Sequence, residues 1–195
     1  CIGVFEVVKF HTKRHRAGGG GCRIVEIMLK RCARPSRYWL VNADLRTLQR
    51  SSVESRVYLE PGIEHPSWNM QTAAKSARAA AHALSAVFRA APLCCVISTL
   101  GGNTGSGASP VVARLARDMQ LRCLTIATTP FAWESEQRHR NARAALSMLE
   151  QQAAQVDLIR LDDHMSGNEH EPFDAILDRV TAAAMKRIDA AAPPA

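Results

Sequence analysis

The amino-acid sequence predicts an α/β protein of three layers, in which helices cover both faces of a mainly parallel sheet. Short apolar runs alternate with helical stretches along the chain, as they do in sheets built from strand–helix units. Several of these runs are apolar throughout, which is typical of strands buried on both faces. Two glycine-rich segments each stand between an expected strand and an expected helix, which is where ligands bind in such sheets.

The individual strands and helices follow from the local pattern of each segment. Strands are expected at residues 2–10, 38–42, 56–59, 93–100, 121–128 and 156–161. Helices are expected at residues 22–32, 71–90, 109–119, 134–152 and 171–188, with Pro110 in a first turn, where proline is tolerated. Because the chain has no evident linker or internal repeat, we expect one domain over residues 1–188 and a frayed tail over residues 189–195.

Composition and cysteine spacing exclude several classes of protein. Of the 195 residues, 47% are hydrophobic and 22% are charged, so the chain is not disordered as a whole. No stretch approaches the roughly 18 apolar residues that a membrane span needs, and we expect no signal peptide. The six cysteines include no CxxC pair, so we expect reduced thiols, no metal centre and a cytoplasmic protein.

The net charge of +7 comes from the N-terminal quarter of the chain. Residues 1–50 hold eleven Lys and Arg against three Asp and Glu, whereas the remaining residues are nearly balanced. Such a cluster attracts the phosphates of a nucleotide, a nucleic acid or an anionic membrane. A solvated basic surface is the simpler interpretation.

The densest glycine segment, GGNTGSG at residues 101–107, predicts a phosphate-binding loop. Its glycines leave backbone N–H groups unobstructed, its two hydroxyl groups are donors, and the helix that follows offers its positive end. The segment is not a Walker A loop, because no Gly-Lys-Ser/Thr follows, and a tight structural turn is the alternative. The candidate phosphate ligands are Gly101, Gly102, Asn103, Thr104, Gly105, Ser106 and Gly107.

This segment resembles the signature loop of the tubulin/FtsZ superfamily, GGGTG[ST]G, with Asn103 in place of the third glycine. The flanking sequences CVISTL and ASPVVA are also similar to those of bacterial FtsZ. The resemblance implies a Rossmann-like GTPase domain that binds GTP or GDP.

Further family elements follow in the family's order along the chain. In this chain GGGGCR, at residues 18–23, resembles the family's first glycine loop. VNAD, at residues 41–44, with Leu48 resembles the second loop, VNTDxxxL. PFAWE, at residues 130–134, with an Arg four residues later resembles PFxFExxxR. A Phe-x4-Asp pattern stands on the expected last helix. The nucleotide-binding residues implied are Gly19, Gly20, Gly21, Cys22, Arg23, Asn42, Asp44, Glu134, Arg138, Phe173 and Asp178.

The resemblance also implies a role for several of these side chains. Glu134 would bind the ribose and Arg138 would lie beside the nucleotide, although the two alone would form an ordinary surface ion pair. Phe173 would stack on the base, and Asp178 would accept from the N1 and N2 donors of guanine. Arg23 stands where the family usually has Asn, and a cation there could meet a phosphate.

Two departures from the family pattern bear on hydrolysis. The third loop has one glycine, within residues 60–69, which predicts weaker discrimination of GTP from GDP. The sequence ends near the central helix, whereas the family continues with an acidic loop that completes the site of a neighbouring subunit. We therefore assign no catalytic residue and expect hydrolysis to be slow or to depend on a full-length FtsZ-type homologue. Mg²⁺ would accompany GTP, with Asp44 as a candidate oxygen ligand.

Two functions thus remain open. The first is a guanine-nucleotide-binding protein that modulates the assembly of a cell-division polymer. The second is a non-enzymatic interaction module whose basic N-terminal segment contacts membrane or nucleic acid. A dehydrogenase is the weakest alternative, since no acidic residue follows the glycine segment at the spacing that binds a ribose.

Overall fold

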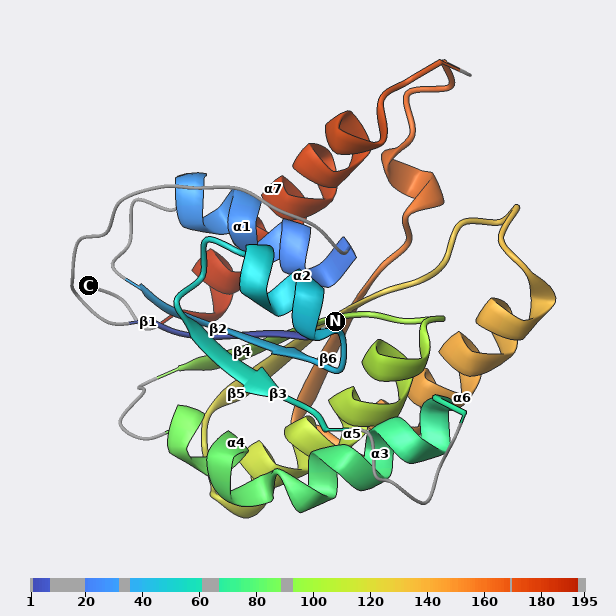
Figure 1. The fold of residues 1–195 in the computed structure, drawn as a ribbon. Helices are drawn as coiled ribbons and strands as arrows, with labels where there is room; N and C mark the ends of the chain where they lie inside the picture. The colour runs from blue at the N-terminus through green and yellow to red at the C-terminus, as the bar shows by residue number, and fades with distance from the viewer. Residues whose placement is uncertain are drawn as a thin grey trace.

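The structure, a computed structural model, describes residues 2–7, 20–31, 36–60, 67–88, 93–168 and 170–192. Its centre is a six-stranded sheet with the strand order β3-β2-β1-β4-β5-β6 (Figure 1). The strands are β1 (Ile2–Val7), β2 (Ser36–Asn42), β3 (Ser55–Tyr58), β4 (Cys94–Thr99), β5 (Cys123–Thr128) and β6 (Gln155–Ile159).

Most strand pairs of the sheet are parallel, as predicted. β2 pairs with β3 in parallel, and β4, β5 and β6 form a parallel set. β1 runs antiparallel to both neighbours, with Val4 opposite Trp39 of β2 and Val96 of β4. The carboxyl ends of β4, β5 and β6 therefore lie at the same end of the sheet, where the loops that follow them meet.

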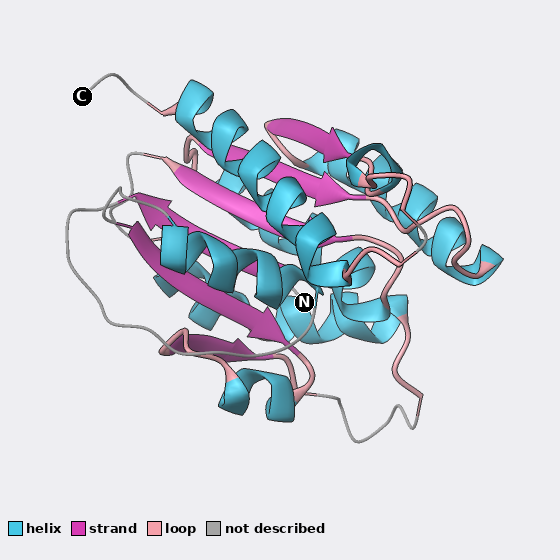
Figure 2. Cartoon of the chain, turned by 90° about the horizontal axis from the view of Figure 1, so that it is seen from above, coloured by secondary structure: helices cyan, strands magenta, loops and turns pink. Residues whose placement is uncertain are grey.

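Helices cover both faces of the sheet (Figures 1 and 2), which confirms the predicted three-layer architecture. One face carries α1 (Gly20–Arg31), α2 (Leu45–Arg50) and α7 (Phe173–Ala191). The other carries α3 (Met70–Ala79), α4 (Ala81–Val87), α5 (Asn103–Asp118) and α6 (Glu136–Gln152). None of the described helices is long and apolar enough to cross a membrane.

The helices pack through apolar residues at helical spacing. α1 buries Ile24 and Met28, one turn apart, in the core on the first face. α5 buries Ala108, Val112 and Ala116 at four-residue intervals on the second face. Small residues predominate on this stripe of α5, so the helix can lie close to its neighbours.

Some elements begin or end at other residues than the pattern predicts. The helix expected at residues 71–90 is divided at Ala80 into α3 and α4. α2 was not expected, because six residues are too few for a helical period to show in the sequence. α7 continues to Ala191, so most of the tail expected at residues 189–195 is helical where it is described.

The start of α5 corrects a more important prediction. The helix begins at Asn103, inside the glycine-rich segment, and not at Ser109. Pro110 therefore stands in the helix interior, where it leaves the carbonyl of Ser106 without its helical partner. Glycine and proline disfavour helix locally, but tertiary packing overrides this preference here.

One of the cysteines also differs from the prediction. Cys22 takes part in a disulfide bond, which corrects the expectation of reduced thiols at this residue. Cys94, Cys95 and Cys123 form no disulfide and are buried, and burial raises the pKa of the Cys95 thiol. Sequence spacing does not show which cysteines approach within bonding distance, so the bond could not be predicted.

Candidate functional site

A cavity of about 360 Å³ opens where β4 and β5 end. Because these strands are parallel, the segments that follow them meet beside α6 and α7. The lining consists of Thr99 and Leu100 after β4, Thr128, Thr129, Pro130, Phe131, Trp133 and Glu134 after β5, Arg138 of α6, Leu161 after β6, and Phe173 and Leu177 of α7. The cavity thus lies at the carboxyl ends of the strands, where a ligand was expected.

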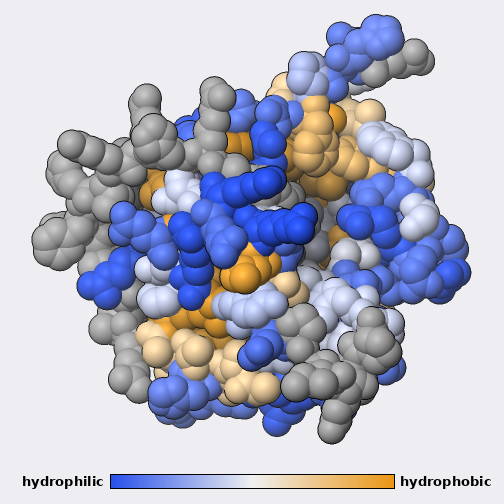
Figure 3. Space-filling model, viewed as in Figure 1, coloured by the Kyte–Doolittle hydropathy of each residue, from blue (hydrophilic) through white to orange (hydrophobic). Residues whose placement is uncertain are grey.

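Aromatic rings form one side of the cavity. Phe131 and Trp133 stack with ring centroids 4.3 Å apart, and Phe173 meets the edge of Phe131 at 6.0 Å. Trp133 is 64% exposed and Phe173 is 48% exposed. Apolar surface gathers over the start of α7 and the adjoining segment after β6 (Figure 3). Such exposed rings beside a cavity offer stacking surfaces to a flat ligand.

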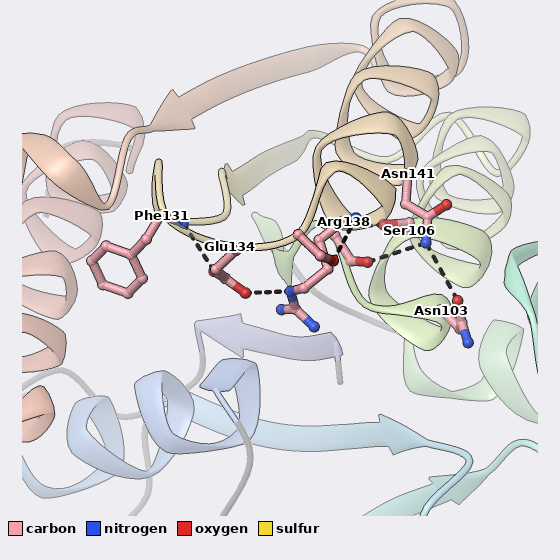
Figure 4. Close-up of polar contacts among 8 residues, drawn as sticks. Asn103, Ser106, Phe131, Glu134, Arg138 and Asn141 are labelled. Atoms are coloured by element: carbon pink, nitrogen blue, oxygen red, sulfur yellow. Dashed lines mark hydrogen bonds and ion pairs between the residues drawn. The ribbon is translucent and has the colours of Figure 1, made fainter.

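Glu134 and Arg138 connect the turn after β5 to the glycine segment (Figure 4). Glu134 accepts a hydrogen bond of 2.9 Å from the backbone N–H of Phe131, and it forms an ion pair with Arg138. A Cβ placed on Gly102 would lie 4.0 Å from a terminal nitrogen of Arg138. The guanidinium therefore stands beside the N-terminus of α5, where it adds a positive charge.

The first backbone N–H groups of α5 have no partner within the helix. Gly102 is the N-cap and provides no side chain, and the first helical bond runs from Ser106 N–H to the Gly102 carbonyl at 2.9 Å. The N–H groups of Asn103, Thr104 and Gly105 consequently have no acceptor within the helix. Together with the helix dipole, they form an anion-binding site next to Arg138.

The turn that precedes α5 requires a glycine at residue 101. Its φ is +98°, a conformation that other residues rarely adopt. Its N–H donates to the hydroxyl of Ser106 at 2.8 Å, and Ser106 is fully buried. The structure thus places Ser106 beneath the turn, where it holds the loop in shape.

The last two glycines of the segment serve helix packing. A Cβ on Gly105 would lie 2.1 Å from the carbonyl oxygen of Thr99 in β4. A Cβ on Gly107 would lie 2.1 Å from the carbonyl oxygen of Met70 in α3. Both contacts are impossible for another residue without movement of the backbone. Because Gly105 and Gly107 have no Cβ, α5 can lie close to β4 and α3. These two glycines serve this packing and do not open a path to an anion.

A polar network that the sequence did not reveal surrounds the same helix end. The Trp68 indole donates to the Thr104 hydroxyl at 3.1 Å, and the Asn103 amide donates to the Trp68 carbonyl at 2.7 Å. Asn141 of α6 donates to the Gly101 carbonyl at 3.2 Å and to the Asn103 side chain at 3.4 Å (Figure 4). Asn103 thereby links α5 to the segment before α3 and to α6.

The comparison with protein families identifies the fold. A model described as "Tubulin/FtsZ family, GTPase domain" matches residues 15–162. The chain belongs to the tubulin/FtsZ family. The match confirms the resemblance read from the glycine segment and its flanking motifs.

Curated relatives and solved structures agree with this membership. The chain is 31% identical over 135 residues to the cell division protein FtsZ of Mycoplasmopsis pulmonis, covering 68% of this chain and 34% of that protein. It is also 31% identical over 124 residues to the FtsZ of Wigglesworthia glossinidia brevipalpis, covering 62% and 32%. The chain thus spans about a third of the length of these relatives.

The structural matches show the same fold. FtsZ from M. jannaschii matches with a TM-score of 0.75 and 18% identity, over 87% of this chain and 50% of that one. CetZ2 from Haloferax volcanii, solved as a GTPγS-bound protofilament, matches with a TM-score of 0.67 and 24% identity, over 78% and 48%.

Within this tubulin/FtsZ-family fold, the described part of the first glycine loop is the start of α1. Gly19 lies outside the described residues, whereas Gly20 and Gly21 are the first two residues of the helix. Cys22 is buried, and Arg23 forms an ion pair with Asp174 of α7.

The second family loop is held by its own side chains. Asn42 accepts from the Asp44 N–H at 3.3 Å, and its amide lies 3.9 Å from the Cys22 sulfur. Asp44 caps α2, accepting from Arg46 N–H at 3.0 Å and from the N–H and hydroxyl of Thr47 at 3.3 and 2.6 Å. The Thr47 hydroxyl, and then the backbone N–H groups, hold the pKa of Asp44 below its usual range despite partial desolvation.

Asp178 lies away from the cavity. Its carboxylate accepts from Arg31 of α1 at 2.7 Å, and Asp178 is absent from the cavity lining. Leu177, which the sequence analysis did not single out, lines the cavity instead. The signal for Leu177 was its four-residue spacing from Phe173, which places the two on one face of a helix.

Proposed function

We propose that the chain binds a guanine nucleotide in this cavity, as a member of the tubulin/FtsZ family. The observation that carries the proposal is the uncapped N-terminus of α5, which stands beside Arg138 at one end of a cavity with aromatic walls. A phosphate and a flat base are the two chemical groups that such a site accommodates.

The phosphates would bind at the start of α5. The N–H groups of Asn103, Thr104 and Gly105 offer three donors, and the helix dipole favours an anion. Arg138 would pair with a phosphate oxygen through its guanidinium, which forms the stronger, charge-assisted kind of hydrogen bond. The residues present therefore fit a phosphate group.

The ribose and the base would occupy the rest of the cavity. Glu134 is an acceptor that can bind a ribose hydroxyl, while its hydrogen bond to the Phe131 N–H holds it in place. The exposed rings of Trp133 and Phe173 offer the base a stacking surface. Thr128 has a buried hydroxyl without a hydrogen-bond partner among the described residues and lines the cavity, so a bound ligand would supply the partner.

Hydrolysis by the isolated chain is proposed to be slow or to need a full-length homologue. Two of the carboxylates that follow β6 are engaged in holding loops. Asp162 accepts from the Ala132 N–H at 3.1 Å, and Glu171 accepts from Ser166 N–H and Arg179. A Mg²⁺ bound with GTP, which would neutralise phosphate charge, would share Asp44 with the cap of α2. We further propose that the chain modulates a cell-division polymer through this nucleotide-bound domain.

Thermal unfolding of the purified chain with GDP and with guanosine tests the proposal. A ligand present at about 100 times its Kd stabilises a protein by about 2.7 kcal/mol, which raises the Tm of a chain of this size by several degrees. We expect this shift with GDP and a much smaller one with guanosine, which lacks the phosphates. Equal shifts with both, or none with either, would contradict the proposal.

Gly102→Asp gives a sharper test with a matched control. An Asp at the N-cap would accept from the N–H groups of Thr104 or Gly105 and would fill the anion site with its own carboxylate. We expect the variant to fold at least as stably as the wild type and to lose the GDP-dependent shift. Gly102→Ala leaves the donors free, since a Cβ there meets nothing closer than 4.0 Å, and it should retain the shift.

A further inference from the structure

We propose that the cavity selects its base by stacking and not by a carboxylate of α7, so that it binds adenine nucleotides about as well as guanine nucleotides. The inference rests on the proposed function, since it concerns the same cavity. It assigns the base contact of α7 to Phe173, next to the buried Leu177 of the cavity wall, and it makes Asp178 a structural residue that joins two helices.

The helical period of α7 separates its cavity face from its acidic face. Phe173 and Leu177 are one turn apart, and both line the cavity. Asp174 and Asp178 are also one turn apart and are held by two arginines of α1. Since each residue advances about 100° around a helix, Asp178 points about 100° away from Leu177.

Packing on the opposite side fixes this rotation of α7. Ile176 and Val180 are buried in the core between the helix and the sheet, with exposed fractions of 5% and 0%. α1 adds Arg23, which pairs with Asp174, and Arg31, whose guanidinium lies 2.7 Å from the Asp178 carboxylate. Turning α7 so that Asp178 faced the cavity would break both ion pairs and expose the buried residues, so the residue of α7 that is free to meet a base is the exposed Phe173.

The remaining polar lining does not distinguish guanine from adenine. Glu134 is the only carboxylate among the described residues of the lining, and it already holds the Phe131 N–H and Arg138. The lining residues Thr99, Thr128 and Thr129 carry hydroxyl groups, which both donate and accept. A hydroxyl can donate to the carbonyl oxygen of guanine or accept from the amino group of adenine. Among the described residues, therefore, this lining contains no group that selects against either purine.

The aromatic residues would bind a base by stacking, and this interaction does not depend on which hydrogen-bonding groups the base carries. Trp133 is the most exposed of them, at 64%, and it is already stacked on Phe131. Phe173 stands at the edge of Phe131 and is 48% exposed. Every nucleobase has a π-face, so stacking on such rings tolerates any purine.

Titration calorimetry of the 195-residue chain with GDP and with ADP tests the inference, since neither diphosphate has a γ-phosphate to hydrolyse. We expect the two Kd values to agree within tenfold. Trp133→Ala and Phe173→Ala should each weaken both nucleotides by about tenfold or more, whereas Trp133→Phe, which keeps a ring, should change them little. Asp178→Asn should leave both Kd values and their ratio unchanged, and circular dichroism should confirm that each variant is folded.

The outcomes separate the inference from the proposed function. If GDP binds more than tenfold tighter than ADP, the inference is overturned, and loss of that preference in Asp178→Asn would show that this carboxylate reads the base. If neither nucleotide binds the wild type, the proposed function fails and the inference fails with it. Binding of both nucleotides that depends on Trp133 and Phe173 supports both.

Discussion

The carboxylate of Asp178 lies 2.7 Å from the guanidinium of Arg31, and this ion pair turns Asp178 from the cavity toward α1. The next residue toward the N-terminus, Leu177, is 1% exposed at the cavity wall. Two adjacent positions of one helix thus have separate tasks. One packs in the wall of the cavity, and the other joins the two helices on that face of the sheet.

Arg31→Met is expected to lower the free energy of unfolding by no more than about 1 kcal/mol, because both side chains of the pair are nearly half exposed and solvent screens their attraction. Nucleotide affinity should not change. Urea unfolding and calorimetry of the same variant check the two parts. A tenfold loss of GDP affinity would show that the pair acts on the site.

Gly105→Ala is expected to destabilise the fold by about 1–3 kcal/mol, since the added Cβ would lie 2.1 Å from the Thr99 carbonyl oxygen and force α5 away from β4. Gly102→Ala is the matched control at the same helix end, because a Cβ there has room. Urea unfolding measures both variants. If they are equally stable, the close approach of α5 is not what requires a glycine at residue 105.

Arg138→Ala is expected to weaken GDP binding by about tenfold or more, as the loss of a charge-assisted hydrogen bond to a phosphate costs about 1.5–3 kcal/mol. Arg140→Ala is the control, because Arg140 is on the same helix, is exposed and pairs with Glu136 outside the cavity. It should bind GDP as the wild type does. Equal losses in the two variants would indicate a general effect of charge and not a phosphate contact.

The stability of the fold should fall in acid partly through Glu171. The backbone N–H of Ser166, and then the Arg179 guanidinium, hold the pKa of the Glu171 carboxyl below its ordinary 4.5. A carboxyl whose pKa is lower in the folded state stabilises the fold while ionised, and this contribution disappears as the pH falls through the folded-state pKa. Urea unfolding between about pH 3 and pH 7 should show the decline below about pH 4.5.

Glu171→Gln isolates this contribution. The variant should be less stable than the wild type near neutral pH, and the difference should shrink in acid, where the wild-type carboxyl is protonated too. The decline should be shallower but not absent, because the pKa values of Asp44 and Glu136 are also lowered. Parallel curves for the two proteins would exclude Glu171 as a source of the acid sensitivity.

The sequence predicted the layers of the fold and the end of the sheet at which the cavity opens, because both depend on local pattern. Alternating apolar runs and helical stretches indicate a parallel sheet, and a glycine segment between a strand and a helix indicates where the ligand lies. Glu134, Arg138 and Phe173 line the cavity, and their motifs were recognised as those of the family.

The sequence did not predict which atoms each residue contacts, because these depend on packing between distant segments. The four glycines of residues 101–107 were expected to act alike, whereas Gly105 and Gly107 are required by β4 and α3. Asp178 matched a family pattern, but its partner is an arginine 147 residues away. Trp68 lies in the segment of the third loop, which does not match the family pattern, yet its indole donates a hydrogen bond to the Thr104 hydroxyl.

A crystal structure of the chain with GDP is the decisive experiment on the proposed nucleotide site, because it locates the phosphates. If α5 binds them, a phosphate oxygen will lie within hydrogen-bonding distance, about 2.7–3.2 Å, of the backbone nitrogens at the start of this helix, with Arg138 on the same group and the base against Phe173. GDP bound elsewhere, or an α5 N-terminus that faces solvent while GDP is bound, would contradict the proposal.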